Sequence, residues 1–165
     1  MEITSLDIDV QYALEGTDID KNQIPNVSDF NKWASAALSG KKDEAQLSIR
    51  IVDENEISQL NQTYRHKQGP TNVLSFPADL ARDVPLSLLG DIVICAPIVI
   101  SEATQQEKNC AAHWAHMTVH GTLHLMGYDH ENEEEAKIME NLEIEILDSL
   151  GFDNPYQEFR ENITT

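Results

Sequence analysis

Histidine crowding is the feature of this sequence that most restricts how the chain can fold. Five of the six histidines in the 165-residue chain fall within eighteen consecutive positions: His113, His116, His120, His124 and His130. A helix turns by about 100° per residue, so the first four project from one narrow helix face. Burying so many imidazoles without partners costs roughly a few kcal/mol each. A ligand or a dense hydrogen-bond network is therefore required if this face turns inward.

The spacing of three of these histidines predicts a metal site. His120 and His124 lie four residues apart, so their imidazoles can converge on one ion. Gly127 can end the helix in a left-handed conformation, which brings His130 back toward the same point. These offsets match the metal motif of the metzincins. Since three imidazoles leave one tetrahedral position for water, we predict one catalytic Zn²⁺ per chain on His120, His124 and His130.

The neighbouring side chains allow other assignments. His116 and His120 form a rival pair with the same spacing, but only His120 and His124 are followed by a suitably placed glycine and third histidine. We expect His116 to have a structural role or to support a ligand, and His113 to be an ordinary core or solvated residue. Asp129 can orient a ligand imidazole, or it can simply be a turn residue.

The residue after His120 indicates what the metal does not do. Zincin peptidases carry a general-base glutamate at that position, where this chain has Gly121. Without that base, a peptidase loses proton-transfer catalysis of about 10²–10⁴-fold, which disfavours peptide hydrolysis. A metal also neutralises phosphoryl oxygens, so phosphodiester cleavage remains feasible if a cation helps with the charge.

Arg65 is the candidate for that cation. It stands beside His66 and Lys67, in a chain that contains only eleven Lys and Arg residues. A guanidinium grips a phosphate through two hydrogen bonds and stabilises charge in the transition state. Thr71 and Ser75, in the polar segment that follows, can donate to phosphate oxygens. The alternative for Arg65 is a cation that complements the dipole at a helix C-terminus.

Apolar periodicity predicts the element order β-α-β-α-β-β-α-α-α, and hence an α/β or α+β fold. The expected strands lie at residues 4–10, 47–52, 72–76 and 91–95. The expected helices begin near Ser28, Asp53 and Pro97, and two longer ones cover residues 110–126 and 133–150. The second helix should open with a capping box of Asp53 and Glu56, carry an apolar stripe of Ile57, Leu60 and Tyr64, and end at Gly69-Pro70.

Composition limits the function classes. The length suits one domain, which we expect over residues 1–153, with a polar C-terminal tail over residues 154–165. The longest apolar run, residues 92–100, is too short to cross a bilayer, and no secretory signal is evident. We therefore expect a cytoplasmic protein with no membrane partner and with Cys95 and Cys110 as free thiols. The net charge of −18 disfavours non-specific binding to nucleic acids or anionic membranes.

Four blocks of the sequence resemble the YbeY family of bacterial metal-dependent endoribonucleases. The most specific block runs from His120 to His130 and reads HGTLHLMGYDH. The others are NQTYRHKQGPTNVLSFP at residues 61–77, LGDIVI at 89–94 and AHMTV at 115–119. One departure is Asn72, where the family usually carries Asp. The resemblance covers most of residues 50–150.

The resemblance implies an α+β fold: a mostly parallel four-stranded sheet with one antiparallel strand, flanked by about five helices. It implies zinc on His120, His124 and His130, and contact of Arg65 with RNA phosphate. The implied function is cleavage of single-stranded RNA in the 3′-end maturation of small-subunit ribosomal RNA and in ribosome quality control. The implied partners are ribosomal RNA and the small subunit or a protein associated with it.

Three functions are therefore compared with the structure. The first is the endoribonuclease, with either water or the 2′-hydroxyl of the RNA as the nucleophile. The second is a zinc peptidase or amidase whose base comes from elsewhere, for example the acidic stretch after His130. The third is a non-catalytic ribosome assembly factor in which the zinc only holds the last two helices together.

Overall fold

The computed structural model describes residues 5–14, 19–78 and 87–156. These residues form the strands β1 (Ser5–Ala13), β2 (Glu44–Val52), β3 (Val73–Pro77) and β4 (Leu88–Cys95). They also form the helices α1 (Val27–Leu38), α2 (Glu54–Arg65), α3 (Ala96–Gln105), α4 (Cys110–Leu125) and α5 (Glu133–Ser149), with a 3-10 turn, η1, at Lys21–Gln23. The order of strands and α-helices along the chain is the predicted one.

The four strands form one mixed sheet in the order β1-β2-β4-β3. The pairs β1–β2 and β2–β4 are parallel, whereas β3 runs antiparallel to β4, with Ser75 opposite Ile92. The α+β fold with a mostly parallel sheet, one antiparallel strand and five helices is therefore confirmed for the part of the chain described. β3 is an edge strand, and the sheet is open beyond it within these residues.

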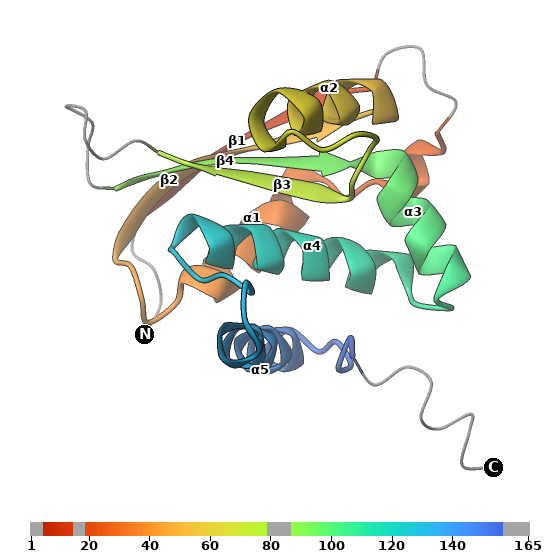
Figure 1. Ribbon diagram of the computed structural model, residues 1–165. Helices are drawn as coiled ribbons and strands as arrows, with labels where there is room; N and C mark the ends of the chain where they lie inside the picture. The colour runs from red at the N-terminus through yellow and green to blue at the C-terminus, as the bar shows by residue number, and fades with distance from the viewer. Residues whose placement is uncertain (1–4, 15–18, 79–86, 157–165) are drawn as a thin grey trace.

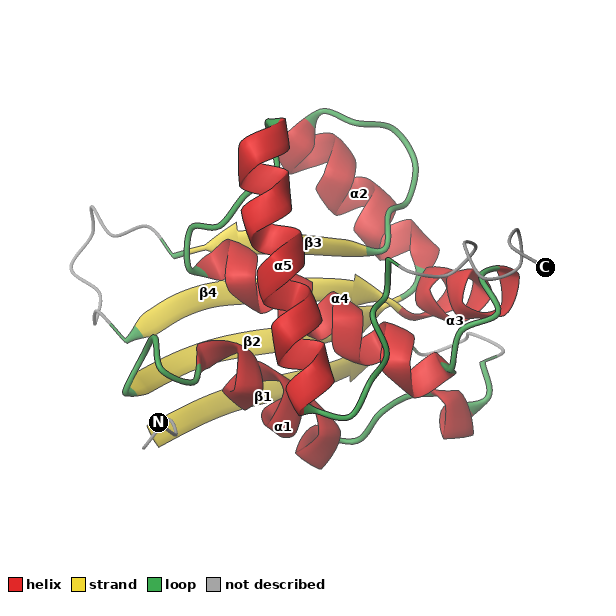
Figure 2. Ribbon diagram, turned by 90° about the horizontal axis from the view of Figure 1, so that it is seen from below, coloured by secondary structure: helices red, strands yellow, loops and turns green. Residues whose placement is uncertain are grey.

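The helices form layers on the two faces of the sheet (Figure 1). α2 covers one face, over a small cluster of Val52, Ile57, Leu74, Val93 and Cys95. α1 and α4 cover the other face and enclose the main core, and α5 packs outside α4 and crosses it (Figure 2). Because side chains alternate along a strand, Leu47, Ile49 and Ile51 of the central strand β2 all point into that main core. α4 thus lies between two layers, and most of its residues are buried.

Polar side chains set the beginnings of the helices. Asn26 caps α1, and its Oδ1 accepts a hydrogen bond from the Asp29 amide at 2.8 Å. Asp53 caps α2 in the same way, as predicted, by accepting from the amide of Glu56 at 2.9 Å. The carboxylate of Glu56 forms an ion pair with Arg50, with Nε and Oε2 2.5 Å apart. The expected return bond from Glu56 to the Asp53 backbone is therefore replaced by an ion pair with β2.

α2 ends at Arg65, before Gly69-Pro70 as predicted, but His66 rather than Gly69-Pro70 ends the helix. The helix stops at Arg65, four residues before Gly69, because His66 adopts a left-handed conformation with φ of 58°. The amide of Lys67 then bonds the Asn61 carbonyl at 3.2 Å, which closes the last turn. Tyr64 does not join the apolar stripe with Ile57 and is 64% exposed. The early stop releases residues 66–72 as an extended segment that leads into β3.

The C-terminal region packs further than the predicted domain boundary after residue 153. Pro155 is buried, and Tyr156 makes hydrogen bonds inside the body of the protein. Residues 157–165 of the predicted tail lie outside the described residues. The division at residue 153 thus stays a prediction, and its first tail residues, 154–156, are part of the packed structure.

Two further expectations concern the environment of the protein. Cys95 and Cys110 are free thiols, and burial raises the pKa of Cys95 to about 11. Among the described helices, none combines the length and the apolar character needed to span a bilayer.

The packing of α1 gives the first testable prediction. Phe30 is fully buried and meets Trp33 and Trp114 edge-to-face, with ring centroids 5.8 and 6.0 Å away. Phe30→Ala should therefore lower the free energy of unfolding by about 3–5 kcal/mol, measured by urea denaturation. Val27→Ala, on the same helix at a position 45% exposed, should change it by less than about 0.5 kcal/mol. Equal effects at the two positions would contradict this core.

Candidate metal centre

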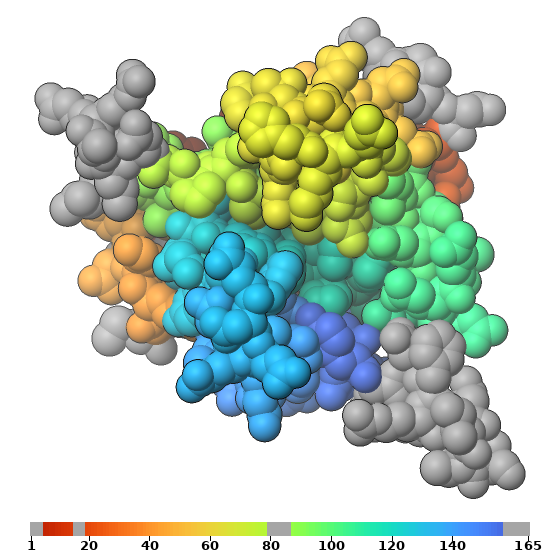
Figure 3. All heavy atoms as spheres, viewed as in Figure 1, coloured from red at the N-terminus to blue at the C-terminus, as the bar shows by residue number. Residues whose placement is uncertain are grey.

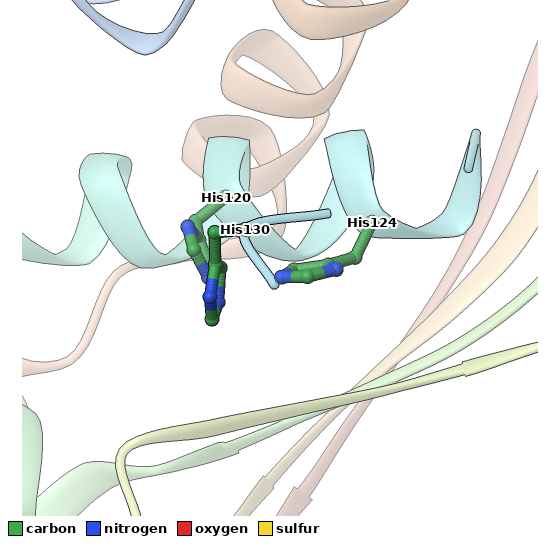
Figure 4. Close-up of side chains that lie close together, drawn as sticks. All are labelled: His120, His124 and His130. Atoms are coloured by element: carbon green, nitrogen blue, oxygen red, sulfur yellow. The ribbon is translucent and has the colours of Figure 1, made fainter. Parts of the chain in front are cut away.

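Three histidines converge at the C-terminal end of α4 (Figure 4). His120 and His124 lie one turn apart on the helix, and Gly127 reverses the chain with φ of 100°. One ligand atom from each of His120, His124 and His130 lies within 4.8 Å of the other two. Among the described residues this group has three members, and no fourth acidic, cysteine or histidine side chain joins it. The predicted reversal at Gly127 is confirmed.

The three imidazoles pack closely and suit a cation: His124 meets His120 and His130 edge-to-face, and His120 stacks on His130. The ring centroids of His120 and His124 are 4.7 Å apart, and the His130 centroid lies 5.5 and 5.1 Å from them. Burial, together with the nearby His120 and His130, lowers the pKa of His124 to about 4. His124 is therefore neutral at pH 7 and keeps a free electron pair for a metal. The donor set fits a zinc ion.

Glu143 is the residue of this centre that the sequence analysis missed. It lies on α5 and is fully buried, and its Oε2 accepts a hydrogen bond from His120 Nδ1 at 2.6 Å. This bond fixes the tautomer of His120 and leaves Nε2 for a metal. Burial would raise the pKa of Glu143, but the hydrogen bonds from His116 and His120 hold it well below its ordinary value. The carboxylate is thus charged and oriented.

The remaining histidines of α4 have carboxylate partners, of which Glu143 is buried and Glu102 is partly exposed. His116 Nε2 donates to Glu143 Oε1 at 2.6 Å, in agreement with the supporting role expected for it. His113 Nε2 contacts Glu102 at 2.9 Å and is only 4% exposed, so it is a core residue. Burial lowers the pKa of His116. The Nε2 atoms of His113 and His116 are thus bonded to Glu102 and Glu143, whereas their buried Nδ1 atoms have no hydrogen-bond partner among the described residues.

Asp129 serves as a turn residue. Its Oδ1 accepts from the backbone amide of His130 at 2.8 Å. The same oxygen lies 4.0 Å from His124 Nδ1, which is too long for a hydrogen bond. The orienting carboxylate for a ligand imidazole is therefore Glu143 on His120.

A hollow of about 290 Å³ opens in front of the three histidines. It lies between the segment after α2, yellow-green in Figure 3, and the cyan residues that follow α4. In addition to the histidines, it is lined by Asn61, Arg65, Lys67 and residues 71–75. Arg65, Thr71 and Ser75, which the sequence analysis placed with the metal, thus share one hollow with it.

These three residues differ in what they can offer a substrate. Arg65 is exposed, and no described residue forms an ion pair or hydrogen bond with its guanidinium. Thr71 is partly buried in the wall of the hollow. Ser75 Oγ donates to the Gly121 carbonyl at 3.0 Å, so its proton already ties β3 to α4. The hydroxyl proton of Ser75 is thus already engaged within the protein, and Arg65 and Thr71 remain as the lining residues to consider as donors.

Two asparagines shape the wall that carries Arg65. Asn61 is buried, and its amide donates to the Gly69 carbonyl at 3.0 Å, which holds the segment after α2 against the helix. The Asn72 amide donates to Glu102 at 3.2 Å, and its Oδ1 accepts from the Val73 amide at 2.7 Å. An aspartate at position 72 would face Glu102 with like charge. The departure at Asn72 therefore suits the acidic partner that this chain has.

Gly121 lies where α4 approaches the sheet most closely. A Cβ atom there would be 2.8 Å from Ile92 Cγ2 and 3.3 Å from Ser75 Oγ. No larger side chain fits without moving the helix, so a glutamate at this position is excluded by packing. The close approach of α4 to β3 and β4 thus goes together with the absence of a side chain, and so of the zincin base, at position 121.

These features define a class: an α+β protein in which three histidines suited to a metal ion share a hollow with an arginine. A sequence model described as Endoribonuclease YbeY matches residues 15–151. The chain is 53% identical over 155 residues to a protein of Xanthomonas axonopodis pv. citri (strain 306) named Endoribonuclease YbeY, covering 92% of this chain and 93% of that protein. A protein of the same name from Xanthomonas campestris pv. campestris (strain B100) is 52% identical with the same coverage. The chain belongs to the endoribonuclease YbeY family.

A solved structure supports the fold. The solution structure of TM1509 from Thermotoga maritima superposes with a TM-score of 0.50, over 91% of this chain and 99% of that one. The two sequences are 24% identical, so the likeness concerns the fold alone.

The close approach at Gly121 predicts whether an added methyl group lowers or raises the free energy of unfolding. Gly121→Ala should lower the free energy of unfolding by about 1–3 kcal/mol, because the new methyl group collides with Ile92. At an open helical position the same change stabilises a protein by up to about 1 kcal/mol. Thermal or urea denaturation measures the difference. A more stable variant would show that α4 is not packed this tightly on the sheet.

Proposed function

We propose that this chain is a zinc-dependent endoribonuclease that cleaves single-stranded RNA. In this proposal His120, His124 and His130 hold one Zn²⁺ in a metzincin-like arrangement, and Arg65 acts as the catalytic cation that grips the scissile phosphate. Thr71 binds a neighbouring oxygen of the substrate. The observation that carries the proposal is the shared hollow: the histidine cluster and Arg65 come from distant parts of the chain and line the same cavity.

The protein residues have distinct tasks in this reaction. Zinc supplies a Lewis acid and lowers the pKa of water when it is bound. Glu143 holds His120 in one tautomer and orientation throughout. The guanidinium of Arg65 binds the phosphate through two hydrogen bonds and stabilises the extra negative charge of the transition state. The exposed position of Arg65 leaves it free to meet an RNA backbone.

The surroundings of Arg65 suit a single strand. Tyr64 is exposed and packs edge-to-face on Phe76, with ring centroids 5.4 Å apart. Tyr64 precedes Arg65 and Phe76 follows Ser75 in the sequence, and the two rings lie outside the lining of the hollow. Unpaired bases stack on such rings, with about 1–3 kcal/mol per base, whereas paired bases are not available for it. The exposed ring of Tyr64 therefore supports a preference for single-stranded over double-stranded RNA. Stacking does not depend on charge, so it can act in a chain whose net charge disfavours RNA.

The packing of Gly121 argues against the zinc peptidase or amidase. That reaction needs a base near the first histidine, and position 121 has no room for one. The acidic stretch after His130 includes Glu131, Glu133 and Glu134, which are exposed on the surface. Among the described residues, none of these carboxylates joins the histidine group.

We further propose that the RNA is ribosomal and that cleavage serves 3′-end maturation of the small-subunit RNA and ribosome quality control in the cytoplasm. The names of the relatives support the endoribonuclease activity alone. With a net charge of −18, the isolated chain should bind RNA weakly and with strong salt dependence. Recruitment by the small subunit or an associated protein would supply the missing affinity.

Charge reversal at Arg65 tests the role of the cation. Arg65→Glu should abolish cleavage of a single-stranded RNA oligonucleotide, while the free energy of unfolding changes by less than about 0.5 kcal/mol because the side chain is exposed. Lys137→Glu on α5 makes the same change of net charge at another exposed site and should retain activity. Equal activity of the two variants would contradict the role of Arg65. The ends of the products identify the nucleophile: a 5′-phosphate indicates water and a 2′,3′-cyclic phosphate the 2′-hydroxyl.

Metal removal separates the enzyme from the assembly factor. Elemental analysis of the purified protein should give one zinc per chain, and a chelator should stop RNA cleavage until Zn²⁺ is restored. His130→Ala removes an exposed ligand, so it should lose zinc and activity while the protein stays folded. A zinc-loaded protein that cleaves no RNA, and that unfolds when the metal is removed, would favour the assembly factor with a structural zinc.

A further inference from the structure

Residues 152–156 form a C-terminal strap, and we propose that this strap positions the metal ligand His120 through Tyr156 and Glu143. Docking of the strap and binding of zinc are then coupled. The inference rests on the metal site of the proposed function, and it adds a positioning residue, Tyr156, that lies far from His120 in the sequence.

The contact between the strap and the centre is a hydrogen-bond chain. The Tyr156 hydroxyl donates to Glu143 Oε1 and lies 3.2 Å from His116 Nε2. Its ring also meets the His116 ring edge-to-face, with centroids 5.4 Å apart. Glu143 Oε2 accepts from His120 at 2.6 Å. One carboxylate thus joins Tyr156 on one oxygen to the ligand imidazole on the other.

Glu143 has little freedom of its own. The side chain is fully buried, and hydrogen bonds to His116, His120 and Tyr156 engage both of its oxygens. Rotation of the carboxylate toward His116 would loosen the bond to His120. By holding Oε1, Tyr156 and His116 keep Oε2 aimed at His120 Nδ1, so the orientation of the ligand depends on a residue that touches no metal.

The strap is tied down at several points before it reaches Tyr156. The Phe152 amide donates to the Leu147 carbonyl at 2.9 Å, and the Phe152 ring meets the Trp33 ring edge-to-face. Lys108 Nζ donates to the carbonyl of Pro155 at 2.9 Å, and Pro155 itself is buried. These contacts hold the strap in a defined position, from the end of α5 to Lys108, just after α3.

The strap also lies outside the family match, which ends at residue 151. The ligands and Glu143 lie inside that match, whereas Tyr156 lies beyond it. By thermodynamic reciprocity, if a docked strap raises zinc affinity by some factor, zinc favours docking by the same factor.

The test compares two tyrosines that each donate one hydroxyl hydrogen bond. Tyr156→Phe keeps the ring and removes the hydroxyl; Tyr12→Phe does the same on β1, where the hydroxyl bonds Pro25 O at 2.8 Å. Their exposures are similar, 40% and 44%. Affinity for Zn²⁺ is measured on the full chain by competition with a chromophoric chelator. Tyr156→Phe should weaken it at least about threefold, and Glu143→Gln about 10–100-fold, while Tyr12→Phe leaves it unchanged.

Amide hydrogen exchange supplies a second readout that needs no activity. Zn²⁺ should slow exchange at Phe152 and Tyr156 in the wild-type chain, and this effect should vanish in Tyr156→Phe. Unchanged zinc affinity in Tyr156→Phe, or an equal loss in Tyr12→Phe, would overturn the strap proposal alone. A wild-type chain that binds no Zn²⁺ would instead overturn the metal site, and the strap proposal with it.

Discussion

The contact of α4 with the sheet at Gly121 determines most of what this protein can do. With no side chain there, the helix lies against Ile92 and accepts the Ser75 hydroxyl on its Gly121 carbonyl. This packing sets His120 and His124 beside the edge strand β3, where the sheet is open, and it brings them to the hollow that also holds Arg65. The same contact removes the space for a peptidase base. One packing constraint thus selects both the position of the centre and the chemistry open to it.

Electrostatics act on two scales in this molecule. Over the whole chain, twenty-nine acidic residues against eleven basic ones repel polyanions. Within the centre, Glu143 uses a single buried negative charge to hold His116 and His120, and the exposed Arg65 supplies a local positive one. The proposed nuclease therefore relies on local geometry and on stacking at Tyr64 for its substrate, and on partners for affinity. An acidic surface with a small cationic hollow restricts which RNA can react.

Much of this arrangement was readable in the sequence, because it depends on local periodicity. The order of the elements, the cap at Asp53 and the reversal at Gly127 all follow from short-range rules. The residue that ends α2 does not follow from these rules. His66, not a glycine, takes the left-handed conformation there, and backbone hydrogen bonds to the carbonyls of Asn61 and Gln62 stabilise it. Glu143 was also missed, since α5 is rich in exposed acids. The available signal was its spacing, four residues after Met139 and three before Ile146, on the inward face of the helix.

The central claim is that His120, His124 and His130 share one metal ion and leave part of its coordination shell to solvent. X-ray absorption at the zinc edge of the zinc-loaded protein tests it most directly. The account predicts three imidazole nitrogens at about 2.0–2.1 Å and one further light atom that solvent or an added anion can exchange. Two imidazoles, or a shell closed by a fourth protein side chain, would contradict it.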